Sequence, residues 1–156
     1  MSKEDLYRPN VAVIVVSKDY PKKKEIFLAQ RNDITDVWQF PQGGIDDGEE
    51  VKEALFRELE EEIGTSSVEI IAEFPEWVSY DFPPKIAKTM KPFIGQKQRY
   101  FLVKLQPNAE INIQTKHPEF MDYKFVQTQD VLELSSSFKK DVYKNVINYF
   151  VKEGLL

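Results

Sequence analysis

Three glutamates stand close together in an acidic run of the chain, Glu58-Leu59-Glu60-Glu61-Glu62. On a helix, side chains three or four residues apart are neighbours, so Glu58, Glu61 and Glu62 gather on one face. Like charges at this spacing destabilise a helix, whereas a hard cation that takes oxygen ligands, such as Mg²⁺, reverses the sign of that interaction. The run alone favours the simpler interpretation, a solvated helix face.

The residues on both sides of the run favour a metal site instead. They fit the pattern G-x₅-E-x₇-R-E-U-x-E-E-x-G-U, where U is aliphatic, with Gly43, Glu49, Arg57, Glu58, Leu59, Glu61, Glu62 and Gly64. The one departure is Thr65 in the last aliphatic position, which we expect to pack rather than to react. Through this pattern the sequence resembles the Nudix family of hydrolases.

The Nudix resemblance implies a fold and a set of roles. It implies one Nudix hydrolase domain over residues 1–156, an α/β/α sandwich with a central mixed β-sheet. It also implies that the three glutamates hold divalent metal ions and that Gly43 allows a tight turn. Arg57 and Glu49 would pair and hold the loop against the helix, which makes Arg57 part of the catalytic machinery. The alternative for Arg57 is a surface ion pair with Glu53 or Glu61.

Further strings outside this pattern resemble the bacterial RNA pyrophosphohydrolase branch of the family. They are Tyr7–Val11, Trp38–Gly44, Ile94–Gln98, Pro118–Phe120 and Ser137–Lys139. This resemblance implies removal of pyrophosphate from the 5′-triphosphate end of RNA, which leaves a monophosphate and promotes mRNA decay. The alternative substrate is a diadenosine polyphosphate. A binding module without catalysis is a third hypothesis, and the intact glutamates speak against it.

The same resemblance assigns residues to the substrate. Glu119 would be a fourth catalytic carboxylate and metal ligand, brought in by a loop, and Arg8 would reach toward the phosphates. Arg31 and Phe138 would sandwich a base, and Lys139 would touch the RNA backbone or a base edge. Such stacking suits single-stranded RNA ends, whose bases are free. The alternatives are a surface strand charge for Arg31 and a core residue for Phe138.

The implied cofactor is Mg²⁺, with Mn²⁺ as the alternative ion. Hydrolysis of a phosphoanhydride needs neutralised phosphate charge and an activated water in line with the bond. Bound metal ions supply both, by polarising phosphoryl oxygens and by lowering the pKa of bound water. A carboxylate near the metals would orient or deprotonate that water.

The elements that position these residues follow from hydrophobic periodicity. A helix is expected over Glu50–Ile63, with Leu55, Phe56, Leu59 and Ile63 on its core face. Asp47 is placed to cap its N-terminus and Gly64 to end it. Strands are expected over Asn10–Ser17, Glu25–Arg31, Val68–Phe74, Arg99–Leu105 and Lys124–Val126, and a closing amphipathic helix over Lys139–Val151. Strands before and after a central helix indicate a mixed sheet covered by helices.

Composition sets the outer limits. The 156 residues are 42% hydrophobic and 30% charged, which is typical of one globular domain. The absence of cysteine excludes disulfides and thiolate metal sites. A net charge of −5 argues against coating nucleic acid by bulk electrostatics but leaves room for a small basic pocket. The longest apolar run, Val11 to Val16, is far short of the roughly 20 residues of a membrane span. We therefore expect a cytoplasmic protein, and its size favours a monomer.

Overall fold

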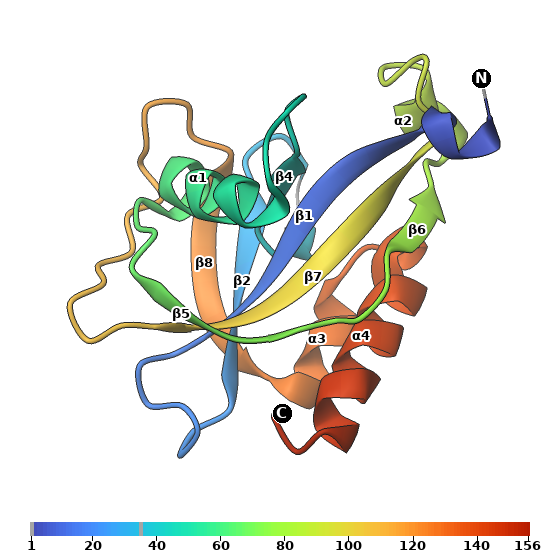
Figure 1. The fold of residues 1–156 in the computed structure, drawn as a ribbon. Helices are drawn as coiled ribbons and strands as arrows, with labels where there is room; N and C mark the ends of the chain where they lie inside the picture. The colour runs from blue at the N-terminus through green and yellow to red at the C-terminus, as the bar shows by residue number, and fades with distance from the viewer. Residues whose placement is uncertain (1, 35) are drawn as a thin grey trace.

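A mixed sheet of eight strands forms the centre of the molecule in the computed structural model, which describes residues 2–34 and 36–156 (Figure 1). The strands are β1 (Tyr7–Val16), β2 (Glu25–Arg31), β3 (Trp38–Gln39), β4 (Gln42–Gly44), β5 (Val68–Glu73), β6 (Val78–Asp81), β7 (Gly95–Leu105) and β8 (Phe120–Gln127). Their order is β3-β2-β1-β7-β5, and β4, β6 and β8 pair with β1, β7 and β2. Only the central pair, β1 with β7, is parallel among the described strands.

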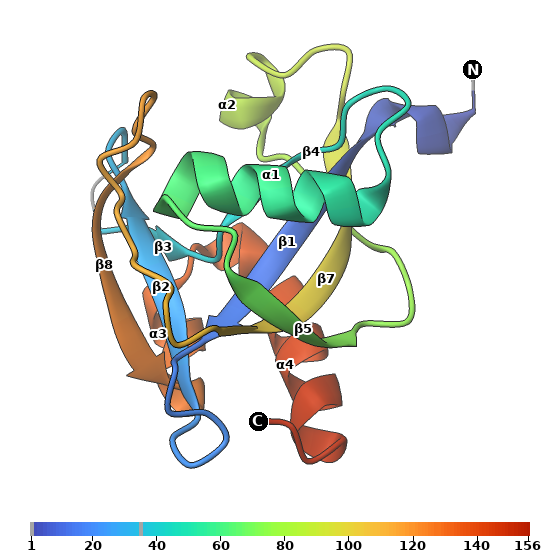
Figure 2. The same cartoon turned by 60° about the vertical axis from the view of Figure 1, so that its left-hand side comes forward.

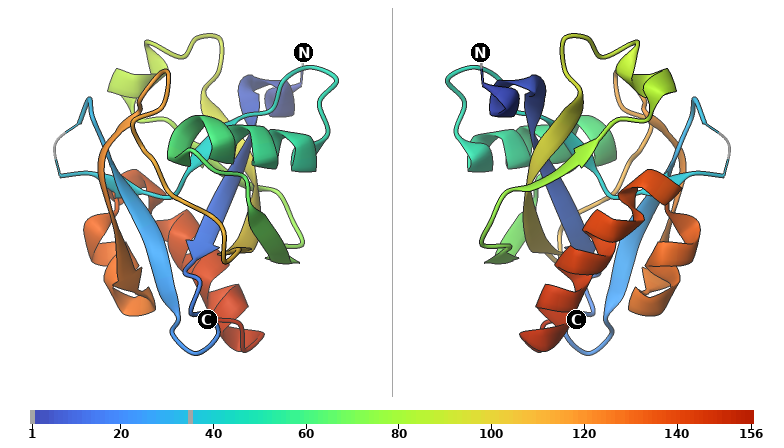
Figure 3. Two further views of the ribbon diagram at one scale, coloured as in Figure 1. Left: turned by 90° about the vertical axis from the view of Figure 1, so that its left-hand side faces the viewer. Right: turned by 90° about the vertical axis from the view of Figure 1, so that its right-hand side faces the viewer.

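Helices cover both faces of this sheet. They are α1 (Val51–Ile63), α2 (Pro84–Ala87), α3 (Val131–Leu134) and α4 (Lys140–Lys152), with short 3₁₀ turns at Lys3–Leu6, Thr128–Asp130 and Ser137–Lys139. Figures 2 and 3 show α1 on one side of the sheet and α3 and α4 on the other. No helix in the described part of the chain is long and apolar enough to cross a membrane.

Strand β1 shows why the sheet is buried on both faces. Its residues alternate between two hydrophobic cores: Val11, Val13 and Val15 pack with α1, and Ala12 and Ile14 pack with α4. A strand covered on both faces reads as an unbroken apolar run rather than as an alternating one. The predicted α/β/α sandwich with a mixed sheet is confirmed.

The start of α1 differs from the prediction. The helix begins at Val51, and its N-cap is Glu50, which makes no side-chain capping bond within the described chain. The predicted cap by Asp47 is wrong, because a turn closed by the Glu49 amide on the Asp46 carbonyl, at 3.0 Å, leaves Asp47 exposed before the helix. The predicted end is confirmed, since Gly64 is the C-cap with φ of 77°.

The buried face of α1 is also turned relative to the prediction. Leu55, Leu59 and Ile63 are buried as expected, but Phe56 is 37% exposed and its place in the core is wrong. Ala54, Glu58 and Glu62, on the other flank of the leucine row, are buried instead. The reason is that two glutamates lie on the buried face of the helix. The buried face therefore differs from the face that carries the apolar residues.

Three strands begin earlier than periodicity indicates. Strand β8 begins at Phe120 rather than at the predicted Lys124. Strands β1 and β7 pair in parallel from Tyr7 with Gly95 onward, rather than from the predicted Asn10 and Arg99. This extension places Arg8 and Gln96 side by side at the start of the central pair. The short strands β3, β4 and β6 were not predicted at all, although β4 and β6 carry residues of the site.

Gly64→Ala is expected to lower the free energy of unfolding by about 1–3 kcal/mol, since a non-glycine residue is strained at positive φ. A Cβ atom there would also lie 2.5 Å from the Asn112 carbonyl oxygen. Gly154→Ala is the matched control, with φ of 75° and no described atom within 4 Å of the added Cβ. Urea unfolding of both variants checks this: an equal loss in the two would show that the contact with Asn112 does not matter.

Candidate active site

Three consecutive residues of β4 each contact a predicted site residue. The Gln42 amide donates to Glu62 Oε2 at 3.3 Å. A Cβ atom on Gly43 would lie 1.9 Å from the carboxyl carbon of Glu58, and one on Gly44 would lie 2.3 Å from an Arg8 guanidinium nitrogen. Strand β4 therefore brings two carboxylates of α1 and a cation of β1 to one place.

The prediction that Gly43 is needed for a tight turn is wrong. Gly43 lies in β4, paired with Val11, and its φ is not in the left-handed region. The glycine that takes positive φ in this loop is Gly48, at 79°. What requires glycine at position 43 is the close approach of the Glu58 carboxylate, which leaves no room for a side chain.

Arg57 makes five hydrogen bonds to four residues, which join α1 to β4 and to the loop after it. Its Nε and Nη2 each donate to a carboxylate oxygen of Glu49 at 2.8 Å, and Nη2 also donates to the Gly44 carbonyl at 2.9 Å. Its Nη1 donates to Glu58 at 2.9 Å and to Glu61 at 3.3 Å. The predicted pairing of Arg57 with Glu49 is confirmed, and the contact with Glu61 accompanies it. The guanidinium lowers the pKa of Glu49 to about 2.

Glu62 is the most buried carboxylate of the site. It is 3% exposed, and its Oε1 has no hydrogen-bond partner among the residues that the structure describes. Burial raises its pKa well above the usual value, and the charges of Glu119 and Glu58 add to the rise. Burial also raises the pKa of Glu58, although Arg57 opposes the shift. Three predicted carboxylates therefore repel one another here, in surroundings that disfavour their charge.

Glu61 and Glu119 are exposed, unlike the buried Glu58 and Glu62. Glu61 extends toward Arg57, with 57% of its side chain exposed. Glu119 lies in the loop before β8, which is tied to the end of β2 by a 2.9 Å bond from the Asn32 amide to the Glu119 carbonyl. The loop origin predicted for Glu119 is confirmed, whereas its catalytic role stays a prediction.

The four predicted metal ligands do not converge tightly. Within residues 2–34 and 36–156, no group of three or more acidic or histidine side chains is close enough to hold a metal ion. The donor chemistry nevertheless fits a hard divalent cation, which takes carboxylate oxygens. Glu62 offers a buried oxygen without a partner, beside the charges of Glu58 and Glu119. A cation at this place would remove their mutual repulsion.

Tyr80 of β6 lies at the centre of the predicted substrate residues. Its hydroxyl accepts a 2.8 Å bond from Gln96 Nε2, and its ring packs on Phe138 with centroids 5.7 Å apart. Burial raises the pKa of Tyr80 to about 12, although the charges of Arg31 and Arg8 act in the opposite direction. Sequence analysis left Tyr80 out of the site, because its segment, Trp77–Pro83, resembles the family only loosely. That loose resemblance was the signal that could have found it.

Arg31, Phe138 and Lys139 are near one another but do not form an open base clamp. Arg31 makes a two-pronged ion pair with Asp33, one bond of which is 2.7 Å, and Phe138 is half-buried against the α4 core. Lys139 is 5% exposed, with Nζ 3.4 Å from Gln39 Oε1. Burial, together with the charge of Arg31, lowers the pKa of Lys139 to about 8, and the charge of Glu62 opposes the shift. The base sandwich stays a prediction.

A buried hydrogen-bond network centred on the side chain of Gln98 holds β4 in place. Gln98 Nε2 donates at 2.9 Å both to Asn10 Oδ1 and to Gln42 Oε1, and the Tyr100 hydroxyl donates to Gln98 Oε1 at 2.8 Å. Buried polar groups of this kind are costly unless each is paired. The network therefore fixes Gln42, and with it the position of β4 under Glu62. Sequence analysis matched Gln98 only as part of a family string and assigned it no role.

Gly43→Ala is expected to lower turnover by tenfold or more, because the added methyl group displaces the Glu58 carboxylate. A tenfold loss corresponds to about 1.4 kcal/mol of barrier. Gly44→Ala is the neighbouring control and displaces only the flexible end of Arg8. Steady-state kinetics at saturating Mg²⁺ should then show a fall in kcat for Gly43→Ala and mainly a rise in KM for Gly44→Ala. Normal kcat in folded Gly43→Ala would contradict this account of Glu58.

Comparisons with known proteins show the family of the chain. The NUDIX domain model matches residues 6–146. The chain is 66% identical to the RNA pyrophosphohydrolase of Nitratiruptor sp. over 148 residues, 95% of this chain and 96% of that one. It is 60% identical to the RNA pyrophosphohydrolase of Campylobacter jejuni over the full length of both chains.

Solved structures with low sequence identity share the fold. The Escherichia coli dihydroneopterin triphosphate pyrophosphohydrolase superposes with a TM-score of 0.72 at 18% identity, covering 92% of this chain and 98% of that one. A Caenorhabditis elegans Ap4A hydrolase gives 0.67 at 19% identity, covering 93% and 98%. The chain belongs to the Nudix family and, by its full-length relatives, to the RNA pyrophosphohydrolase branch.

Proposed function

We propose that this protein is an RNA 5′-pyrophosphohydrolase, which removes pyrophosphate from the 5′-triphosphate end of RNA and leaves a 5′-monophosphate that promotes mRNA decay. The full-length relatives with that name support the proposal. The structural observation that carries it is the meeting of opposite charges, the carboxylates of Glu58 and Glu62 on one side and Arg8, Arg31 and Lys139 on the other, around β4 and Tyr80.

The cations suit the polyphosphate end of the substrate. Guanidinium groups bind phosphate oxygens through two parallel hydrogen bonds, so Arg8 would hold the phosphates from the start of β1. Arg31 would supply a second guanidinium next to the site, and Phe138 an aromatic face for the first bases. Lys139 would act from its buried position as a fixed positive charge rather than as a flexible surface contact.

The acidic residues suit the reaction. Glu58, Glu61, Glu62 and Glu119 would hold Mg²⁺, or Mn²⁺ in its place, which when bound supplies charge neutralisation and water activation. The oxygen of the attacking water forms a bond with one phosphorus atom of the α–β anhydride, the bridging bond breaks, and pyrophosphate leaves. Glu119, exposed at the end of its loop, would orient the water and accept its proton. Arg57 would keep Glu58 in place throughout.

All of these groups come from one chain, which supports a working monomer as part of the same proposal. A cytoplasmic location follows from the substrate, since bacterial transcripts are made and degraded there. A diadenosine polyphosphate would need the same metal site and the same stacking residues. The fold likeness to an Ap4A hydrolase, at 19% identity, does not favour that substrate.

We expect a short 5′-triphosphorylated RNA to have a higher kcat/KM than its mononucleoside triphosphate or diadenosine tetraphosphate. The physical reason is that Arg31 and Phe138 can bind bases beyond the phosphates, which contributes about 1–3 kcal/mol per stacked base. Product analysis of the three substrates at one ionic strength, with and without Mg²⁺, measures this. If diadenosine tetraphosphate is the best substrate, the RNA proposal is wrong.

Two neighbouring variants show whether the measured activity belongs to this site. Glu61→Gln removes one proposed ligand charge, whereas Glu60→Gln removes the same charge from an exposed position that the Nudix pattern leaves unspecified. Activity should be lost in the first and kept in the second. Equal activity in both preparations would point to a contaminating phosphatase or to a different site.

A further inference from the structure

We propose that the segment around α2, residues 84–94, binds the RNA chain downstream of its 5′ end. Lys85, Lys88 and Lys91 would contact the backbone phosphates, and the apolar hollow lined in part by Lys88 and Lys91 would receive a base or a ribose. We call this segment the lysine loop. The inference rests on the proposed function and adds a second contact region for the same substrate.

The distribution of charge points to a polyanion at this place. The lysine loop has three lysines and neither aspartate nor glutamate, which gives it a charge of +3. The rest of the chain holds the other 18 cations and all 26 acidic residues, and so carries −8. An acidic protein that binds RNA needs such a local concentration of positive charge, because its total charge repels the backbone.

The three lysines of the loop are available for a ligand. All three are exposed, and none forms an ion pair with a residue that the structure describes. The backbone that carries them is held by short-range bonds, from the Ala87 amide to the Pro83 carbonyl and from the Phe93 amide to the Met90 carbonyl, both 2.9 Å. The loop thus presents its charges from an ordered backbone.

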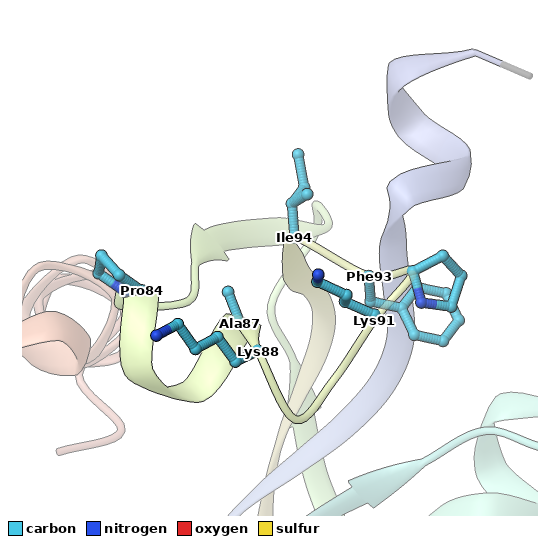
Figure 4. A pocket seen from close by; sticks show the side chains of 7 residues that line it. Pro84, Ala87, Lys88, Lys91, Phe93 and Ile94 are labelled. Atoms are coloured by element: carbon cyan, nitrogen blue, oxygen red, sulfur yellow. The ribbon is translucent and has the colours of Figure 1, made fainter.

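A hollow of about 600 Å³ lies within the lysine loop. Lys88 and Lys91 supply its charge, and the rest of its lining is apolar, with Ala87, Phe93 and Ile94 among the lining residues (Figure 4). Proteins that bind single-stranded nucleic acid combine positive groups for the backbone with apolar or aromatic faces for the bases. This combination fits an RNA strand better than it fits an isolated phosphate ion.

The position of the hollow fits an RNA whose 5′ end is at the active site. The Ile94 amide donates to the Leu6 carbonyl at 2.9 Å, and two residues further along the paired strands Gln96 lies beside Arg8. At about 3.3 Å per strand residue, Ile94 at the edge of the hollow is offset from Arg8 by roughly 7 Å along the strands. In Figures 1 and 2, α2 lies at the same end of β1 and β7 as β4.

The test compares a 5′-triphosphorylated dinucleotide with an unstructured twelve-nucleotide RNA that has the same first two bases. It uses the wild type and a variant with Lys85→Gln, Lys88→Gln and Lys91→Gln. The control variant carries Lys18→Gln, Lys22→Gln and Lys23→Gln, which remove the same charge from exposed positions in the β1–β2 connection at the opposite end of the sheet (Figure 3). The measured quantity is kcat/KM at fixed Mg²⁺ and several salt concentrations.

We expect the wild type to prefer the longer RNA and the lysine-loop variant to lose that preference. Its kcat/KM should fall about tenfold or more on the longer RNA and less than about twofold on the dinucleotide. The slope of log kcat/KM against log salt should become shallower by about 2, since each single-strand phosphate contact contributes about 0.7. The control variant should behave as the wild type.

Three results would overturn the inference while the proposed function stands: an equal loss on both RNAs, a wild type indifferent to RNA length, or the same loss in the control variant. A loop that serves an acidic protein partner instead would leave the kinetics on the longer RNA unchanged, which also overturns it. A wild type that hydrolyses neither RNA contradicts the proposed function itself, and this inference with it.

Discussion

The bonds of the Arg57 guanidinium are the interaction on which the site depends. Arg57 lies on a helix that is anchored in the core by Leu55, Leu59 and Ile63, and its fork binds Glu49 of the loop and the Gly44 carbonyl of β4. Charge-assisted pairs of this geometry are stronger and more directional than neutral hydrogen bonds. They fix the loop on the helix, and the loop in turn carries β4 onto β1.

The same bonds leave the carboxylates of α1 unequal. Arg57 satisfies Glu49 and partly neutralises Glu58. Among the described residues, Glu62 receives only the Gln42 amide and keeps one buried oxygen unpaired. A buried, repelling set of carboxylates destabilises the folded protein unless a cation joins it. A positive charge bound between α1 and β4 would therefore stabilise the folded protein. The proposed phosphate chain of the substrate would lie next to this acidic region, beside the cations Arg8, Arg31 and Lys139.

Much of the fold could be predicted from the sequence, because periodicity reports burial. The strand over Glu25–Arg31 and the leucine row of α1 followed from it. Prediction failed where tertiary structure reverses the usual preference of a residue. Phe56 is exposed because Glu58 and Glu62 occupy the buried face of the helix, and Gly43 is needed for a close approach that no local pattern encodes. Tyr80 enters the site only through the pairing of β6 with β7, which brings distant segments together.

The most direct test of the central claim is a double-mutant cycle between Glu49→Gln and Arg57→Lys, with kcat/KM measured on one triphosphorylated RNA. Lysine keeps the charge of Arg57 but lacks its planar fork, and glutamine keeps the shape of Glu49 without the charge. If the pair holds the active site as one unit, each single variant loses activity. The kcat/KM of the double variant is then no lower than that of the less active single variant. Losses that add, or normal activity in Arg57→Lys, would show that the catalytic carboxylates do not depend on this interaction.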